Sequence, residues 1–172
     1  MRDVKSLRTQ GSQIMNITTS GMYVSLNELY YMYQDGELVI SKNFQRMFHW
    51  TQERQSLFME SLILERPKLS IFVLQTDYGI YELIDGLQRI ATYLRFRGEQ
   101  IGDQPAPLVL RDCRKAPEIN NKSFPGLPKE MQNIIKRICV EMEVVIMEKV
   151  RMEEAVMREA GMEPTGNKAQ DL

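Results

Sequence analysis

The feature that most constrains this chain is a strand that turns on a glycine directly into a helix. Residues 80–84 are an apolar, β-rich run, Asp85 and Gly86 follow at once, and a helical pattern then continues to Gly98. A helix that starts at such a turn leaves its first N–H groups unpaired, and the positive end of its dipole favours an anion there. The sequence therefore predicts a strand–turn–helix unit whose junction suits an anion.

The charged residues at this junction match the chemistry of a phosphate. Arg89 lies in the first helical turn and offers a forked donor that is always charged, while Asp85 offers a carboxylate to a metal ion or a ribose hydroxyl. The alternative is purely structural, because Asp-Gly is a common turn pair and an arginine in a first helical turn is often only solvated. The residues of this segment alone favour neither interpretation.

A second cluster, Phe-Gln-Arg at 44–46 followed by Trp50, precedes this unit in the chain. Arg46 follows a predicted strand and precedes a predicted helix, so it can project toward the same junction as Arg89. Two arginines that converge on one anion would form a strong site. The alternative is an exposed arginine stacked on Phe48 or Trp50.

His49 is the only histidine of the chain. Histidine side chains titrate near neutrality, so His49 could donate a proton beside a phosphate, although a histidine next to a tryptophan is more often packed or exposed. One histidine cannot complete a catalytic triad or a metal cage by itself. The sequence has no nucleophile elbow, Walker P-loop, HExxH or CxxC pattern.

Composition indicates one soluble globular domain in a reducing compartment. The chain has 172 residues, is 43% hydrophobic and carries a net charge of −1, so nucleic acid would have to bind a local patch. Such a patch, or simply a solvated face, could be formed by Arg95, Arg97, Arg111, Arg114 and Lys115.

The two cysteines, Cys113 and Cys139, follow no pairing pattern and favour a reducing cytoplasm. No run approaches the 18 or so apolar residues of a membrane span, and the polar N-terminus does not resemble a signal peptide, so a cytoplasmic location without membrane contact is expected.

Strands and helices alternate along the chain, which predicts a mixed α/β or α+β domain. Ser25 and Glu28 have the spacing of a capping box, and in the helix after Thr51 we expect Leu57, Phe58, Ser61 and Leu62 to share one face. The predicted strands are 37–44, 69–75, 80–84, 138–147 and a short run at 108–110, and the predicted helices are 26–33, 52–66, 87–97, 128–137 and 152–160. We expect a loose arm over 1–22, a domain over 23–163 and a frayed tail over 164–172.

Several of these segments together resemble the N-terminal domain family of the GmrSD type IV restriction endonucleases. The family combines a Phe/Tyr-Gln-Arg element and a nearby Trp, a helix that ends near a proline, a hairpin, and Asp-Gly-Gln-Gln-Arg at the start of a helix. The matching segments are Glu37–Trp50, Leu57–Pro67, Ile71–Val73 and Ile84–Thr92, within a resemblance that extends from about Val24 to about Ile146. Leu87 replaces the usual first glutamine of the last motif, whereas Asp85, Gly86, Gln88 and Arg89 match it.

The resemblance implies a fold similar to the ParB/sulfiredoxin superfamily, a small mixed sheet flanked by helices. It also implies that a nucleoside triphosphate, ATP or GTP, binds at the junction together with Mg²⁺ on Asp85. The binding residues implied are Gln45, Arg46, Asp85, Gly86, Gln88 and Arg89. If the nucleotide is hydrolysed, the residues expected to act are Asp85, Arg89 and His49.

Relatives act in defence against foreign, often modified, DNA, which implies DNA or a nuclease or other defence protein as a partner, and a homo-oligomer as a further possibility. The His-Asn-His pattern of the nuclease domain that usually follows is missing, and residues 157–166 depart from the family's Arg-aliphatic-Asn and Gly-Gly segment. Two hypotheses result: a nucleotide-binding domain with or without hydrolysis, or an inactive DNA- or protein-binding module that serves as a restriction regulator or a phage decoy.

Overall fold

The computed structural model describes residues 7–8, 13–65 and 67–151. Residues 20–145 form one compact unit, which carries every helix that the structure describes, and the remaining described residues belong to a second unit formed by the two ends of the chain. The helix predicted at 152–160, the divergent segment 157–166 and the tail 164–172 lie outside the described residues.

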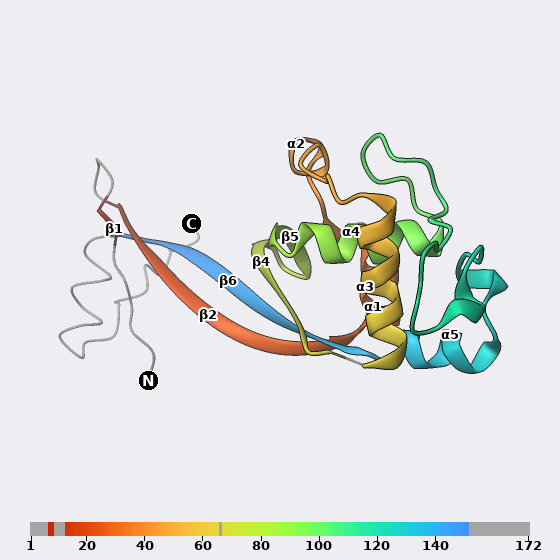
Figure 1. Cartoon of the computed structure of the whole chain (residues 1–172). Helices are drawn as coiled ribbons and strands as arrows, with labels where there is room; N and C mark the ends of the chain where they lie inside the picture. The colour runs from red at the N-terminus through yellow and green to blue at the C-terminus, as the bar shows by residue number, and fades with distance from the viewer. Residues whose placement is uncertain (1–6, 9–12, 66, 152–172) are drawn as a thin grey trace. The chain divides into compact units, whose positions relative to one another are not determined.

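The sheet is mixed, and helices accompany it, which confirms the predicted α+β class (Figure 1). Its strands, in spatial order, are β1 (Leu7–Arg8), β2 (Gln13–Ser25), β6 (Cys139–Arg151), β4 (Leu69–Asp77), β5 (Ile80–Asp85) and β3 (Leu38–Val39). β4 and β5 form the predicted antiparallel hairpin, and β3 runs parallel to β5. β5 therefore delivers the chain to the Gly86 turn from inside the sheet.

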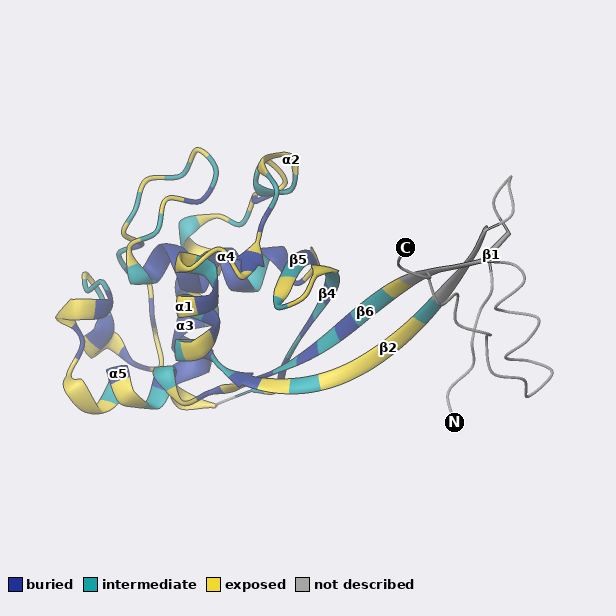
Figure 2. Cartoon of the chain, turned by 180° about the vertical axis from the view of Figure 1, so that it is seen from behind, coloured by how far each residue is buried: buried dark blue, intermediate teal, exposed yellow. Residues whose placement is uncertain are grey.

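Alternation along the strands places one face of the sheet in the core. Val140, Met142 and Val144 of β6 are buried, as the pattern of 138–147 predicted, and buried positions alternate with more exposed ones along this strand in Figure 2. Helices supply the other half of the core, to which they contribute Leu26, Leu29, Met59, Leu62, Ile90 and Leu94.

The helices predicted over 26–33, 52–66, 87–97 and 128–137 all form, each with bounds within two residues of the predicted ones. In α1 (Leu26–Gln34) the Ser25 hydroxyl accepts a hydrogen bond from the Glu28 N–H at 3.0 Å, and in α3 (Gln52–Leu64) the Thr51 hydroxyl caps the Arg54 N–H. α5 (Lys129–Lys136) starts directly after Pro128. In the part of the chain that the structure describes, no helix has the length and apolarity needed to cross a bilayer.

Between the N-terminus and α3 the chain differs from the prediction in two places. The strand expected over 37–44 is reduced to β3, because Ser41 starts a short helix, α2 (Lys42–Gln45), whose Phe44 N–H it caps. Residues 13–25 form β2, although the sequence predicted a loose arm over 1–22. Polar, aperiodic residues can join a sheet when neighbouring strands satisfy their backbone groups, and local pattern gives no sign of that.

Residues 98–126 form no strand, and the run at 108–110 was predicted wrongly. Leu108 donates its N–H to the Arg95 carbonyl, and Leu110 donates its N–H to the Lys122 carbonyl. These buried backbone groups are therefore hydrogen-bonded without pairing to another strand. The rest of this segment contains two 3₁₀ turns, η1 (Pro117–Ile119) and η2 (Phe124–Gly126).

The buried side of α3 agrees only in part with the face that the sequence predicted, because Leu62 is buried there but polar residues are buried as well. Leu57 is 50% exposed, whereas Gln55, Ser56 and Glu60 are buried. Each of the three bonds to the 98–126 segment: Gln55 to Gln104, the Ser56 hydroxyl to the Arg111 N–H, and the Glu60 carboxylate to two backbone N–H groups. Polar groups that are fully paired can be buried at little cost, so hydrophobicity did not identify this face.

Candidate functional site

A cavity of about 610 Å³ opens at the start of helix α4 (Leu87–Arg97). It brings together the two motifs identified in the sequence. The residues that form hydrogen bonds between these motifs are at least 38 positions apart in the chain. Its lining residues are Phe44, Arg46, Met47, His49, Trp50, Ile84, Asp85, Gly86, Leu87, Gln88 and Arg89. All the predicted site residues except Gln45 therefore lie at one place.

Gly86 forms the turn between β5 and α4, and two observations require a glycine there. Its φ of 98° lies in the left-handed region, which side chains disfavour. A Cβ at this position would also lie 2.7 Å from Cγ2 of Ile71 on β4. Gly86 is thus fixed by the packing of the turn against the neighbouring strand.

Helix α4 starts without a side-chain cap. Ser25, Ser41 and Thr51 cap the three preceding helices, but Gly86 has no side chain to do so. The first α4 N–H with an acceptor is that of Ile90, which bonds the Gly86 carbonyl, so the N–H groups of residues 87–89 have no acceptor among the described residues. The cavity therefore contains an open, positively polarised helix N-terminus.

The charged groups that line the cavity are available to a ligand. Arg46 and Asp85 are exposed and Arg89 is half-buried, and none of them forms an ion pair or side-chain hydrogen bond within the described ranges. The only ion pair in those ranges, Lys115 to Glu65, lies elsewhere. Two arginines against one aspartate leave a local excess of one positive charge, which favours an anion.

The side-chain amide of Gln88 forms hydrogen bonds to the loop that carries the other motif. Its Oε1 accepts hydrogen bonds from the N–H groups of His49 and Trp50, both at 3.1 Å, and its Nε2 donates to the Met47 carbonyl at 2.7 Å. The sequence predicted a direct ligand at Gln88. In the structure this residue instead fastens the 47–50 loop to α4.

His49 is exposed, and its ring is oriented by a local contact. Nδ1 lies 2.8 Å from the Met47 carbonyl oxygen. Nδ1 also lies 3.1 Å from the amide nitrogen of Gln88, so the tautomer decides whether it donates to the Met47 carbonyl or accepts from Gln88. The second ring nitrogen, Nε2, has no partner within the described part of the chain and can accept or donate a proton.

Gln45 does not line the cavity, although the sequence placed it there. Its Nε2 donates to the Ile40 carbonyl at 2.8 Å, which closes the segment that leads from β3 into α2. The Gln45 side chain therefore supports the backbone before Arg46. Of the Gln45–Arg46 pair, only Arg46 lines the cavity.

Asp85 is the only carboxylate that lines the cavity. The described ranges contain no cluster of three or more His, Cys, Asp or Glu residues that could hold a metal ion. Mg²⁺ commonly binds one or two carboxylates together with substrate phosphates and water. The donor set thus fits Mg²⁺ bound with a phosphate ligand, and does not fit an all-protein metal cage.

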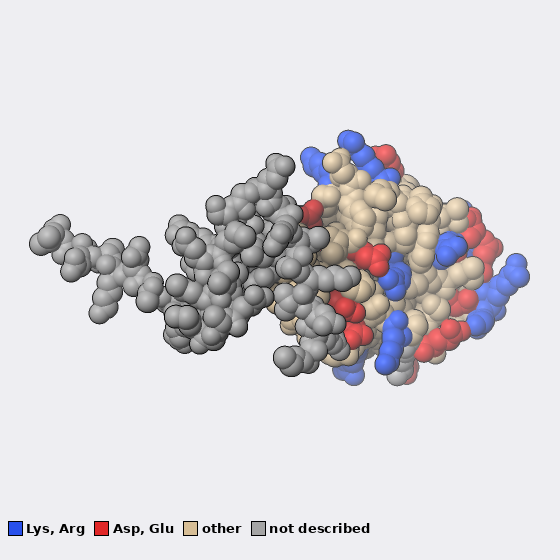
Figure 3. Space-filling model, turned by 90° about the vertical axis from the view of Figure 1, so that its left-hand side faces the viewer, with Lys and Arg blue, Asp and Glu red and all other residues tan. Residues whose placement is uncertain are grey.

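Arg95 and Arg97 do not contribute to the basic patch that the sequence offered as one of two alternatives. Arg95 is 5% exposed and donates to the Pro105 carbonyl and to Gln55, and this burial lowers the pKa of its guanidinium. Arg97 lies 3.8 Å above the centre of the Tyr30 ring and 4.5 Å from that of Phe124. In Figure 3, basic and acidic side chains are interspersed on the visible face.

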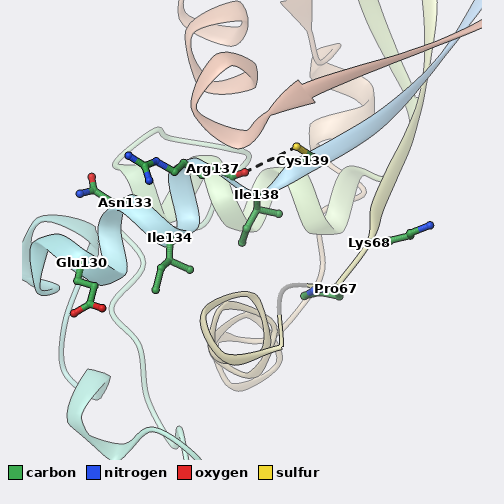
Figure 4. Close-up of a pocket in the computed structure, with 8 residues that line it drawn as sticks. All are labelled: Pro67, Lys68, Glu130, Asn133, Ile134, Arg137, Ile138 and Cys139. Atoms are coloured by element: carbon green, nitrogen blue, oxygen red, sulfur yellow. Dashed lines mark hydrogen bonds between the residues drawn. The ribbon is translucent and has the colours of Figure 1, made fainter.

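A larger cavity of about 740 Å³ lies beside α5 and contains none of the predicted site residues. Figure 4 shows its charged side chains, Lys68, Glu130 and Arg137, pointing away from one another. Cys139 has only a long sulfur contact, 4.0 Å, with the Arg137 carbonyl oxygen. This cavity lacks the convergence of charges found at the start of α4.

Comparison with known proteins gives one match. The family model described as GmrSD restriction endonuclease, N-terminal domain, matches residues 26–160, in agreement with the resemblance seen in the sequence. No curated protein and no solved structure matches the chain.

Proposed function

The chain belongs to the GmrSD restriction endonuclease N-terminal domain family, and we propose that it binds a nucleoside triphosphate, ATP or GTP, in the cavity at the start of α4. One observation carries the proposal: Arg46, from the loop after α2, and Arg89, from the first turn of α4, line the same cavity as the uncapped start of α4. Free N–H groups and two guanidinium forks suit the oxygens of a polyphosphate.

Each group has a distinct part in binding. The N–H groups of residues 87–89 receive one phosphate, and the guanidinium groups of Arg46 and Arg89 neutralise the rest of the chain's negative charge. Asp85 holds Mg²⁺ together with phosphate oxygens, and the ion offsets phosphate charge when bound. Gln88 keeps the 47–50 loop at the cavity, so that both motifs act on the same ligand.

Hydrolysis would need a group that orients a water molecule. His49 supports this step, because its Nδ1 is engaged with Met47 or Gln88 and its Nε2 is left for proton transfer. During transfer the developing charge on the phosphoryl oxygens would be stabilised by Arg46 and Arg89.

A second candidate is a DNA- or protein-binding module without turnover, which would act as a restriction regulator or a phage decoy. The observation that favours it is that Asp85 is the only carboxylate among the described residues that line the cavity, so no second one stands there to activate water. Both candidates relate the chain to restriction and phage defence.

Calorimetry and phosphate release, measured on one purified sample with Mg²⁺, test both candidates. Arg89→Ala should weaken triphosphate binding, while Arg114→Ala should not, since Arg114 is exposed and lies outside the cavity. Binding with phosphate release would support the hydrolase, and binding without it the module. Equal affinity of both variants and the wild type would refute the site.

A further inference from the structure

Trp50 is the largest aromatic residue that lines the cavity, and three glutamines hold its backbone. Its N–H donates to Oε1 of Gln88 at 3.1 Å. Its carbonyl accepts from Nε2 of Gln55 at 2.7 Å and from Nε2 of Gln104 at 3.2 Å. The three glutamines come from α4, α3 and the segment after α4, so one residue is fixed from three directions.

A buried arginine sets the orientation of this arrangement. Arg95 can only donate, and its Nη1 lies 2.7 Å from Oε1 of Gln55. The Gln55 amide therefore presents Nε2 to the Trp50 carbonyl and to Oε1 of Gln104. Gln55 is fully buried and Arg95 nearly so, and burying such groups is favourable only when they are paired as they are here.

The indole ring is fixed as well as the backbone. The Arg54 guanidinium carbon lies 5.0 Å from the ring centre, and Phe58 packs edge-on with a centroid separation of 5.6 Å. Both residues belong to α3, and Arg54 lies over one face of the ring. Trp50 nevertheless remains half-buried at the cavity, so part of the ring is accessible to a ligand.

We infer that Trp50 is the residue that recognises the base of the nucleotide, which stacks on the indole while the phosphates lie at the start of α4. The inference rests on the proposed function and extends it from the polyphosphate to the whole nucleotide. A rigid aromatic ring loses little entropy when a flat base stacks on it, and stacking accepts every base. The polar atoms of Gln55, Gln88 and Gln104 that could read a base edge are already engaged. The site therefore separates nucleotides from bare polyphosphate, but separates ATP from GTP only weakly.

The test compares ATP and GTP with inorganic tripolyphosphate by calorimetry on the full chain. We expect both nucleotides to bind about tenfold more tightly than tripolyphosphate, the order expected for one stacked base. Trp50→Leu should reduce nucleotide affinity to about that of tripolyphosphate and leave tripolyphosphate affinity unchanged. Trp50→Phe should keep most of the difference, because it retains an aromatic face.

Two further measurements separate recognition from support of the loop. Trp50 is the only tryptophan, so its fluorescence should change on addition of ATP and much less on addition of tripolyphosphate. Gln104→Ala removes one hydrogen bond to the Trp50 carbonyl and should lower nucleotide affinity severalfold with no effect on tripolyphosphate. This variant provides the test if Trp50→Leu fails to fold.

The outcomes are distinguishable. Equal affinity of nucleotide and tripolyphosphate for the wild type would overturn the inference and leave the anion site in place. A parallel loss of both ligands in Trp50→Leu and in Gln104→Ala would also overturn it, since Trp50 would then only support the loop. Binding of neither ligand by the wild type would refute the proposed function, and the inference with it.

Discussion

Replacement of Gly86 by alanine should destabilise the domain through two separable effects. The first is backbone strain at a φ of 98°, which costs an L-residue about 1–2 kcal/mol. The second is a clash, because the new Cβ would lie 2.7 Å from Cγ2 and 3.3 Å from Cβ of Ile71, a residue with no solvent exposure. Overpacking of this kind costs about 1–3 kcal/mol. We expect Gly86→Ala to lower the free energy of unfolding by about 2–5 kcal/mol, the sum of the two ranges.

The chain contains a matched control for the backbone effect. Gly98 ends the same helix with a φ of 110°, and nothing lies within 4 Å of a Cβ built there. Gly98→Ala should therefore cost only the backbone part, about 1–2 kcal/mol. Urea unfolding of the two variants, followed by circular dichroism, measures the difference. If Gly86→Ala costs no more than Gly98→Ala, the contact with Ile71 does not constrain the turn.

Three other changes test separate parts of the account. Gln88→Ala should lower the free energy of unfolding by about 1–3 kcal/mol, measured in urea, because it leaves the N–H groups of His49 and Trp50 without their acceptor. A cost near zero would show that water replaces these hydrogen bonds fully. Asp85→Asn should remove most of the Mg²⁺ dependence of triphosphate affinity in calorimetry without weakening tripolyphosphate binding in EDTA, and an unchanged Mg²⁺ dependence would exclude Asp85 as the ligand. Burial raises the pKa of the Cys113 thiol to about 11 from 9.0, with a smaller contribution from Glu60, so only the unfolded state releases this proton between those values. The contribution of Cys113 to the free energy of unfolding should be constant below pH 9 and fall as the pH rises from 9 toward 11. Cys113→Ala should therefore flatten this part of the pH profile measured by urea unfolding. An equally steep profile in the variant would assign the loss to other groups.

The sequence predicted the parts of the fold that depend on local geometry. The capping hydroxyls of Ser25 and Thr51, the glycine turn at Gly86 and the alternation along β6 each follow from a rule about neighbouring residues, and the structure confirms them. The likeness to the ParB/sulfiredoxin superfamily stays a prediction.

Contacts between distant polar side chains could not be predicted in the same way. Gln55 and Gln104 hold Trp50 in place, yet neither stands out in the sequence, because an amide pair 49 residues apart leaves no periodic signal. The same cause explains why the sequence did not identify the polar residues that are buried on α3 beside its apolar ones. Gln88 was identified through its motif, but its partners are backbone groups of the 47–50 loop, which only the three-dimensional arrangement reveals.

Arg46 and Arg89 are proposed to bind one polyphosphate together. A double-mutant cycle tests this proposal, with ATP affinity measured by calorimetry for the wild type, Arg46→Ala, Arg89→Ala and the double variant, and with Arg114→Ala as the control. Each single change should cost about 1.5–3 kcal/mol of binding free energy, as for a hydrogen bond to a charged group. We expect a coupling energy of at least about 0.5 kcal/mol, because residues that share a partner are not additive. Strict additivity, or normal ATP affinity in the double variant, would contradict it.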